Sequence, residues 1–391
     1  MEIFIETKVL LPALQLVTKA IPNRPSHPVL GNVLIQAKDN KVVLKGFDLS
    51  LGIFQVIEEG CTVLIEGSFT VPGKLLLDIT SKLPEGRIRI LTQSLTSAEN
   101  EENTGLIEIK STSVNYEIRG IGAEDFPEFP EVEDAVEISI PAGVLRKGLT
   151  NTLSSASTEE TKQVLTGIHI KFLENAVEFA STDGHRLSVS QLLCDVKESD
   201  LKEVTIPAST LSKLDWALSS LKDDELVKLK VGSAEVAFTI ESLDRSGSIQ
   251  IISRTLEGMF PNYPQLIPRA FNRTAILNRK NLITIIERIG VIAATTNKLL
   301  QFNFTKEGEL TISTTSQDSG SGKEILEIEY TGDDLEVGFN LKYLLAGLKV
   351  VDDEIVSINM NTNLSPVIIR GADPENKAYL YLLMPVQIRK V

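Results

Sequence analysis

Several residue types are scarce in this sequence, and each scarcity excludes a kind of protein. The chain of 391 residues holds two cysteines and three histidines, too few for a disulfide framework or a Cys/His metal cluster. The isolated thiols of Cys61 and Cys194 favour a reducing cytoplasm. No apolar run reaches the roughly 18–20 residues of a membrane-spanning helix, and charges and Pro12 make the N-terminal segment a poor signal peptide. We expect a cytoplasmic protein with no metal, no other cofactor and no membrane contact.

Motifs for covalent catalysis on serine or for phosphate binding are also missing. No two glycines have the spacing of a G-x-S-x-G nucleophile elbow. "SGSGKE" (319–324) fails as a phosphate loop, because Gln317 and Glu324 stand where Gly and Ser/Thr are needed. One polar run, "STDGHRLSV" (181–189), places Asp183 beside His185. It could be a catalytic dyad, a turn capped by Asp183, or a binding loop; because a nucleophile is missing, we expect no enzyme.

One pattern occurs three times along the chain, as in proteins built from internal repeats. It consists of a short strand, a Pro or Asn at a helix start, an apolar helix, a turn and an alternating strand, at 69–90, 204–231 and 337–360. Pro72 and Pro207 are 135 residues apart, and Pro207 and Asn340 are 133 apart. Asp48 and Asp183 (135 residues) and Phe126 and Phe260 (134 residues) keep the same spacing. We therefore expect three similar domains, at 1–130, 131–264 and 265–391.

Each repeat also opens with a longer amphipathic helix. Its apolar positions follow the 3.6-residue period: Leu10, Leu14, Val17 and Ile21 in the first repeat, and Leu282, Ile285, Ile286, Ile289 and Ile292 in the third. Alternating strands follow, as at 32–46 and 300–314, with "AKDNK" and "TKEGE" as hairpin turns. The sequence predicts an α+β fold in which every domain packs two helices on antiparallel sheets.

Positive charge is concentrated in the predicted helices, although the chain as a whole carries a net charge of −14. Lysine and arginine outnumber aspartate and glutamate in each of the helical segments 7–24, 72–82, 142–155, 208–222, 278–298 and 340–351. Helices favour glutamate about as much as lysine, so helix propensity does not explain this bias. A surface lined by these helices would attract nucleic-acid phosphates without reading sequence.

The chain resembles a known family in segments along almost its whole length. They are "RPSHPVLGNVLIQ" (24–36), "FDLSLGI" (47–53), "TDGHRLS" (182–188), "FPNYPQLIP" (260–268), "VGFNLKYLL" (337–345) and "YLLMPV" (381–386). They resemble the bacterial DNA sliding clamps, the beta subunit of DNA polymerase III. The resemblance implies a half ring of three domains, which closes as a head-to-tail homodimer around double-stranded DNA. It also implies a non-catalytic processivity factor that tethers the replicative DNA polymerase.

The resemblance further implies a pocket for short peptides carried by the polymerase, by an ATP-driven clamp loader, and by other replication and repair proteins. The matching residues are Leu165, Thr182, Gly184, His185, Arg186, Leu187, Pro261, Leu266, Pro366, Val367, Leu383, Met384 and Pro385. We expect Leu and Met to form an apolar hole, with Arg186 and His185 as donors on its rim. Gln265, where family members often carry a basic residue, and the extension 387–391 depart from the family pattern, which bears on peptide preference.

For DNA contact, Arg24 matches a family contact position. Further candidates follow from their helices: Lys74, Arg146, Lys147, Arg279 and Lys342. For the dimer seam, we expect Tyr116 and Ile118 on an edge strand of the first repeat to meet Ala293 on a helix of the third. The alternative from another class is a protein-binding scaffold without a DNA function.

Overall fold

The computed structural model describes residues 1–94, 104–111, 114–197, 202–242, 247–294, 298–316, 318–373, 376 and 378–388. The chain forms two compact units, one from Met1–Leu145 and Ser212–Thr255 and the other from Arg146–Leu211 and Leu256–Val391. Each unit contains one outer repeat and part of the central repeat, so the units cut across the predicted three-domain division, which stays a prediction. Residues 389–391 of the C-terminal extension and Gln317 lie outside the described residues.

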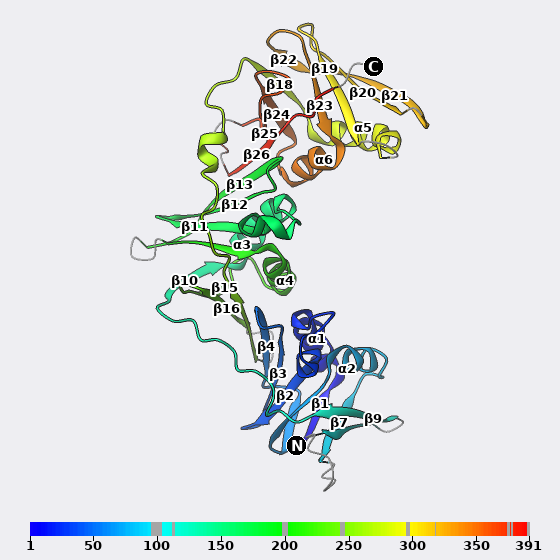
Figure 1. The fold of residues 1–391 in the computed structure, drawn as a ribbon, viewed down its shortest axis with the longest axis vertical. Coiled ribbons are helices and arrows are strands. Elements are labelled where there is room, and N and C mark those ends of the chain that lie inside the picture. The colour runs from blue at the N-terminus through cyan, green and yellow to red at the C-terminus, as the bar shows by residue number, and fades with distance from the viewer. Residues whose placement is uncertain are drawn as a thin grey trace. The chain divides into compact units, whose positions relative to one another are not determined.

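Within the described residues, the first unit is built on one 13-stranded antiparallel sheet (Figure 1). Its strands, in spatial order, are β10 (Val136–Pro141), β15 (Leu226–Val231), β16 (Glu235–Ser242), β17 (Gly247–Arg254), β4 (Leu51–Ile57), β3 (Lys41–Phe47), β2 (Asn32–Lys38), β6 (Gly67–Pro72), β9 (Val114–Ile121), β8 (Thr104–Ser111), β7 (Arg87–Ser94), β1 (Glu2–Glu6) and β5 (Cys61–Ile65). The β17–β4 pairing joins central-repeat strands to first-repeat strands.

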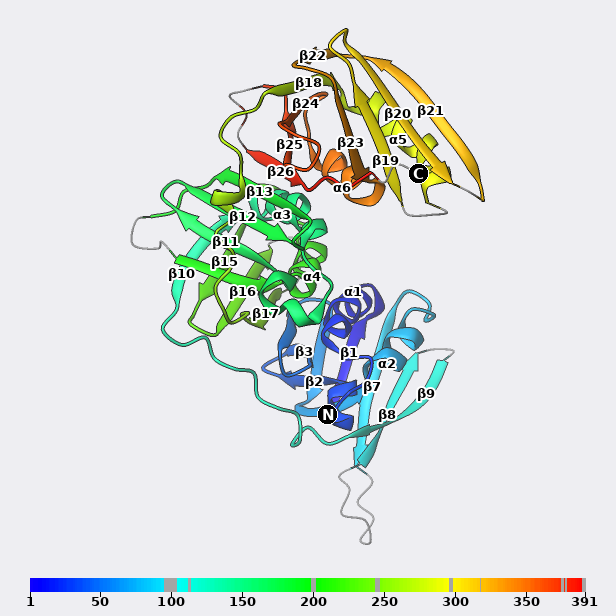
Figure 2. The same cartoon turned by 45° about the horizontal axis from the view of Figure 1, so that its top comes forward.

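The second unit contains a nine-stranded and a four-stranded sheet among its described residues (Figure 2). The nine-stranded sheet runs β14 (Lys202–Pro207), β11 (Gly167–Leu173), β12 (Ala176–Thr182), β13 (Arg186–Leu193), β26 (Tyr379–Leu383), β25 (Val367–Gly371), β24 (Ile355–Met360), β18 (Arg273–Asn278) and β22 (Glu329–Thr331). The four-stranded sheet runs β21 (Gly320–Glu327), β20 (Glu309–Ser316), β19 (Leu299–Phe304) and β23 (Leu335–Asn340). Here the β13–β26 pairing joins central-repeat strands to third-repeat strands.

The predicted helix pairs are present in all three repeats. They are α1 (Thr7–Val17) and α2 (Gly73–Thr80), α3 (Ala142–Thr152) and α4 (Ala208–Leu218), and α5 (Arg279–Ala293) and α6 (Leu341–Val350). α1 packs on α2 and on β1, β3 and β4, whereas α5 packs on α6 and on β18 to β21. The predicted apolar stripes are the buried ones: Leu10, Leu14 and Val17 on α1 are at most 1% exposed, because burial of this face is what stabilises a short helix in water.

The strand-to-helix junctions confirm the repeat. β6 ends at Pro72 and β14 at Pro207, each directly before its helix, where a missing N–H costs little. β23 ends at Asn340, whose side chain accepts hydrogen bonds from the backbone N–H groups of Lys342 and Tyr343. The α+β fold class predicted from the sequence is therefore confirmed, and both predicted hairpin turns, at 37–41 and 305–309, lie between paired strands.

Candidate peptide pocket and nucleic-acid interface

The polar run 181–189 forms the hairpin between β12 and β13. Asp183 Oδ1 accepts from the backbone N–H groups of His185 (2.9 Å) and Arg186 (3.1 Å), and Oδ2 accepts from Arg186 Nε (3.1 Å). Thr182 Oγ1 donates to the Arg186 carbonyl at 2.6 Å, and Gly184 adopts a φ of 93°, which favours glycine. Both carboxylate oxygens of Asp183 are thus used inside the turn. The geometry supports the turn-capping interpretation of Asp183 over the catalytic dyad.

The first repeat contains the same turn. Asp48 Oδ1 accepts from the N–H groups of Ser50 (2.9 Å) and Leu51 (2.7 Å) between β3 and β4. The 135-residue spacing of Asp48 and Asp183 in the sequence therefore reflects one structural role, the capping of a hairpin.

The strands beside this hairpin present two different faces. Arg186 pairs with Leu383 and Leu187 with Leu382 across β13 and β26. Successive side chains of a strand point to opposite faces of the sheet. Leu187 and Leu382 accordingly lie in one cluster with Tyr263, Ile368 and the half-buried Met384. Met384 is fixed there by a backbone hydrogen bond of 2.9 Å to the His185 carbonyl.

The linker between the central and third repeats covers this cluster. Phe260 and Tyr263, the latter in the short helix η6 (Tyr263–Leu266), pack on Leu187 and its neighbours. The Phe260 ring stacks on His169 with centroids 4.8 Å apart, and the Tyr263 hydroxyl donates to Glu178. Leu266 at the end of η6 is 54% exposed. A fixed aromatic wall beside the exposed Leu266 suits a peptide anchor.

The opposite face of β13 and β26 is the one that packs on α6. Val367 and Leu383 are fully buried in the core of the third repeat. The Arg186 guanidinium lies 4.4 Å from the Tyr343 ring centroid and pairs with Asp183. Although burial disfavours its charge, Tyr381 and Asp183 together raise the pKa of Arg186. The Arg186 side chain is therefore held by contacts within the protein, to Asp183 and Tyr343. Val367 and Leu383 lie in the core on the far side of the sheet from the linker.

The other predicted pocket residues have separate placements. His185 is exposed, with its ring stacked on Tyr343 at 6.2 Å. Leu165 lies in the last turn of the short helix η4 (Glu160–Thr166) and is half-buried, as are three prolines: Pro261, Pro366 and Pro385. Three aromatic residues that the sequence analysis did not single out contact the candidate pocket residues, and all three lie in the segments that carry the family resemblance: Tyr343, Phe260 and Tyr263.

In the first unit, predicted DNA-contact residues come together. Lys74 on α2 is exposed and donates to the Asn23 side chain at 2.7 Å, next to the exposed Arg24. Lys19, in the turn that follows α1, lies 4.5 Å from the ring centroid of Trp216 on α4. This unit therefore presents exposed cations on its helices and their flanks, as the charge pattern predicts.

In the second unit, several of the cations are held by the protein itself. Lys147 on α3 forms an ion pair with Asp352, and Arg279 donates to the carbonyls of Asp353 (2.9 Å) and Leu348 (3.4 Å) near the end of α6. Arg146 is half-buried, whereas Lys342 is exposed. The number of lysines and arginines in these helical segments therefore overstates how many cations are available to a ligand. The sequence does not show which of them form ion pairs or contact helix ends within the protein.

Two groups of candidate side chains thus accompany a repeated α+β architecture, a combination typical of a binding protein. No cluster of three or more His, Cys, Asp or Glu suited to a metal occurs in the described ranges. Among the same residues, no helix is long and apolar enough to cross a membrane.

The comparisons with known proteins agree with each other. The DNA polymerase III beta subunit family matches in its N-terminal domain at residues 1–130, its central domain at 139–262 and its C-terminal domain at 264–387. The beta sliding clamp of Synechocystis is 39% identical, and the alignment covers 96% of each chain. The solved sliding clamp of Bacillus subtilis has a TM-score of 0.89 and 26% identity over 100% of both chains. A Pseudomonas aeruginosa sliding clamp bound to griselimycin has a TM-score of 0.87 and 25% identity, over 99% of this chain and 100% of that one.

The chain belongs to the DNA polymerase III beta subunit family, the beta sliding clamps. This confirms the resemblance seen in the sequence and the predicted function class, a processivity factor of DNA polymerase III.

Proposed function

We propose that the chain forms a homodimeric ring in the cytoplasm, which encircles double-stranded DNA without sequence specificity and tethers the replicative polymerase. The observation that carries this proposal is the match of the whole chain to beta sliding clamps. The clamp itself makes and breaks no bonds, and an ATP-driven loader opens the ring. A scaffold without a DNA function is the alternative, but the exposed cations of Arg24, Lys74 and Lys342 favour DNA contact.

The peptide pocket of this proposal lies on the linker-covered face of β13 and β26. Met384 and Leu187 form its apolar floor, and Phe260 and Tyr263 form its wall. The exposed Leu266 and His185 flank it. That a related clamp binds griselimycin supports a ligand-binding surface on this fold. Peptides of the polymerase, the loader and other replication and repair proteins would compete for one site.

The DNA contact is testable by reversing charge in the first unit. Arg24→Glu combined with Lys74→Glu removes two phosphate contacts per chain. We expect binding to a short duplex to weaken at least about tenfold at low salt, with a salt slope shallower by about two per chain. Equilibrium binding titrations at several salt concentrations measure both quantities.

The matched control reverses two exposed lysines away from the helices. Lys41→Glu combined with Lys306→Glu makes the same change in net charge at hairpins, where the side chains are 50% and 70% exposed. We expect a smaller loss and an unchanged salt slope. Equal effects of the two pairs would show that only net charge matters, and would remove Arg24 and Lys74 from the interface.

The dimer seam is proposed to join two open strand edges. β9 pairs with β8 throughout but meets β6 only at Thr70 and Ile121, so the described residues 114–120 leave one edge open. In the four-stranded sheet, β21 is an edge strand. On β9, Tyr116 is 45% exposed and Ile118 (4%) is buried, and on α5 Ala293 (0%) is buried. Buried side chains cannot contact a second chain directly. The apolar contact across the seam is therefore proposed to come from two exposed side chains, Val291 (71%) on α5 and Ile325 (54%) on β21.

Charges placed at this seam are expected to separate the dimer. Tyr116→Glu combined with Ile325→Glu would bury carboxylates at both seams of a closed ring. The dissociation constant should rise at least about 100-fold, which sedimentation or light scattering detects as the mass of one chain. Leu64→Glu should leave the dimer intact, because Leu64 is 55% exposed on β5, the terminal strand of the 13-stranded sheet, from which β1, β7 and β8 separate β9. A dimer that survives the double substitution places the seam elsewhere.

A further inference from the structure

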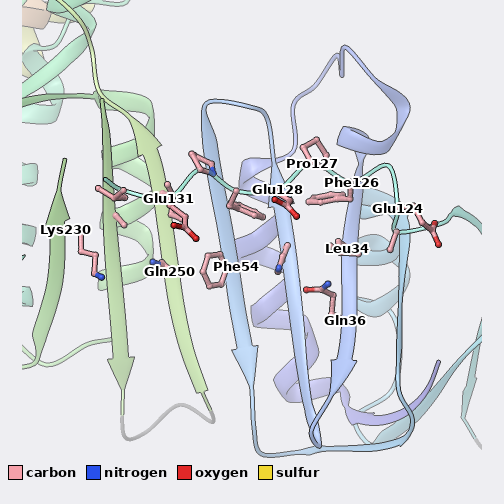
Figure 3. Close-up of a pocket in the computed structure, with 17 residues that line it drawn as sticks. Leu34, Gln36, Phe54, Glu124, Phe126, Pro127, Glu128, Glu131, Lys230 and Gln250 are labelled. Carbon is pink, nitrogen blue, oxygen red and sulfur yellow. The ribbon is translucent and has the colours of Figure 1, made fainter. Parts of the chain in front are cut away.

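A cavity lies under the linker between the first and central repeats, within the first unit. Its volume is about 750 Å³, inside the range of roughly 300–1,000 Å³ that ligand pockets occupy. Figure 3 shows the linker crossing the strands, with Phe126, Glu128 and Glu131 above the sheet, and Phe54 and Gln250 side by side on it.

The floor of this cavity is a row of side chains across four neighbouring strands. Leu34 pairs with Lys45, Lys45 with Phe54, and Phe54 with Gln250, from β2 through β3 and β4 to β17. A second row continues over Ile252, Ala237 and Lys230. The floor therefore spans the β4–β17 pairing, where strands of the first and central repeats meet.

The roof is anchored by aromatic side chains of the linker. Phe126 is buried in a cluster with Leu34 and Phe47. Phe129 lies over Gly52, where a Cβ atom would come within 1.9 Å of its ring, and its centroid is 4.8 Å from that of Phe47. Only glycine at position 52 leaves room for this ring. The linker is thus held in place beside the cavity.

The cavity occupies the same place in the repeat as the proposed peptide pocket. In the first unit, the backbone N–H of Arg254 donates to the Ser50 carbonyl at 2.9 Å. In the second unit, that of Met384 donates to the His185 carbonyl at 2.9 Å. The β4–β17 pairing thus corresponds to β13–β26, with Gly52 in place of Leu187. Both junctions are covered by an F-P-x-[FY]-P linker, at 126–130 and 260–264.

The lining differs in chemistry from that of the proposed pocket. Gln36 and Gln250 are half-buried, and among the described residues neither side-chain amide has a hydrogen-bond partner. Lys230 is paired with Glu137 at 3.0 Å, which neutralises it. Glu128 and Glu131 on the linker are exposed at the rim. The cavity therefore offers apolar floor positions at Leu34, Phe54 and Ile252, two free amides and an acidic rim, with the Lys45 ammonium group 5.8 Å from the Phe129 ring centroid.

We infer that this cavity is a second peptide-binding site, whose ligand is a short extended segment of a partner protein with an apolar side chain beside a basic one. The amides of Gln36 and Gln250 bond the peptide backbone, Phe54 and Ile252 receive the apolar side chain, and Glu128 and Glu131 pair with the basic one. The inference rests on the proposed peptide-binding role of the corresponding pocket in the second unit.

The test uses fluorescein-labelled heptapeptides with Arg-Leu-Phe at the centre and Gly/Ser flanks, titrated into the full chain and followed by anisotropy. Matched peptides carry Glu in place of Arg. The Arg peptides should bind the wild type and Met384→Ala equally. Binding should fall at least about tenfold in Glu128→Lys/Glu131→Lys, and also in Gln250→Trp, which fills the cavity. Glu133→Lys, a linker charge outside the cavity, is the control and should change little.

Three results would overturn the inference. The Arg peptides do not bind the wild type, their binding is lost in Met384→Ala, or they bind Glu128→Lys/Glu131→Lys and Gln250→Trp as tightly as the wild type. A polymerase-derived peptide is titrated in parallel. If it binds while the Arg peptides do not, only the second site is wrong. If neither binds, the proposed peptide capture by this protein fails as well.

Discussion

Met384→Ala is expected to weaken binding of a peptide from the clamp-binding segment of the replicative polymerase at least about 30-fold, the effect of losing roughly 2 kcal/mol at an interface centre. Met384 is half-buried beside Leu187, Leu382 and Tyr263, so truncation removes apolar contact with the ligand while the fold is kept. Anisotropy titration of the labelled peptide measures the loss. Processive synthesis by the polymerase should fall in parallel.

Adding Leu187→Ala should abolish the remaining peptide binding, although Leu187 is 1% exposed and its truncation also costs about 2–5 kcal/mol of folding free energy. The single Met384 variant is therefore the cleaner test. Leu193→Ala is the control, because Leu193 is 87% exposed and lies at the opposite end of β13 from Leu187. Unchanged peptide affinity in Met384→Ala, with an intact dimer, would move the pocket elsewhere.

Tyr381→Ala is expected to lower the free energy of unfolding by about 3–5 kcal/mol, the usual cost of truncating a buried aromatic ring. Tyr381 is fully buried on β26. Its ring packs directly on Gly347 of α6, so closely that a Cβ atom on residue 347 would come within 2.3 Å of the ring. Its hydroxyl donates to the Tyr343 carbonyl at 2.7 Å. Urea-induced unfolding followed by circular dichroism measures the change.

Tyr381→Phe separates the ring from the hydroxyl. It keeps the packing against α6 and loses one hydrogen bond, so we expect a loss of about 1 kcal/mol and normal peptide affinity. If Tyr381→Ala were as stable as the wild type, the packing of β26 on α6 would not support the pocket as described.

Local signals in the sequence were sufficient for much of the fold. The spacing of Pro72, Pro207 and Asn340 located three strand-to-helix junctions, and Leu10, Leu14 and Val17 marked the buried face of α1. These features depend on neighbouring residues only. The α+β class followed from them.

The orientation of the site side chains needed the structure. Val367 and Leu383 look like pocket residues in the sequence, but strand alternation turns them toward α6 and leaves Leu187 and Met384 on the linker side. Likewise, the pairing of Lys147 with Asp352 joins residues more than 200 positions apart. Sheet register and long-range ion pairs depend on tertiary contacts, which no local pattern encodes.

Retention on circular DNA tests the central proposal, that this chain closes around the duplex, most directly. The protein, loaded by its ATP-driven loader onto a nicked circular plasmid, is separated from free protein by gel filtration before and after a single restriction cut. We expect it to stay with the circle and to leave once the DNA is linear, because a ring without sequence contacts slides off a free end. Equal retention on the circular and the linear plasmid would contradict the proposal.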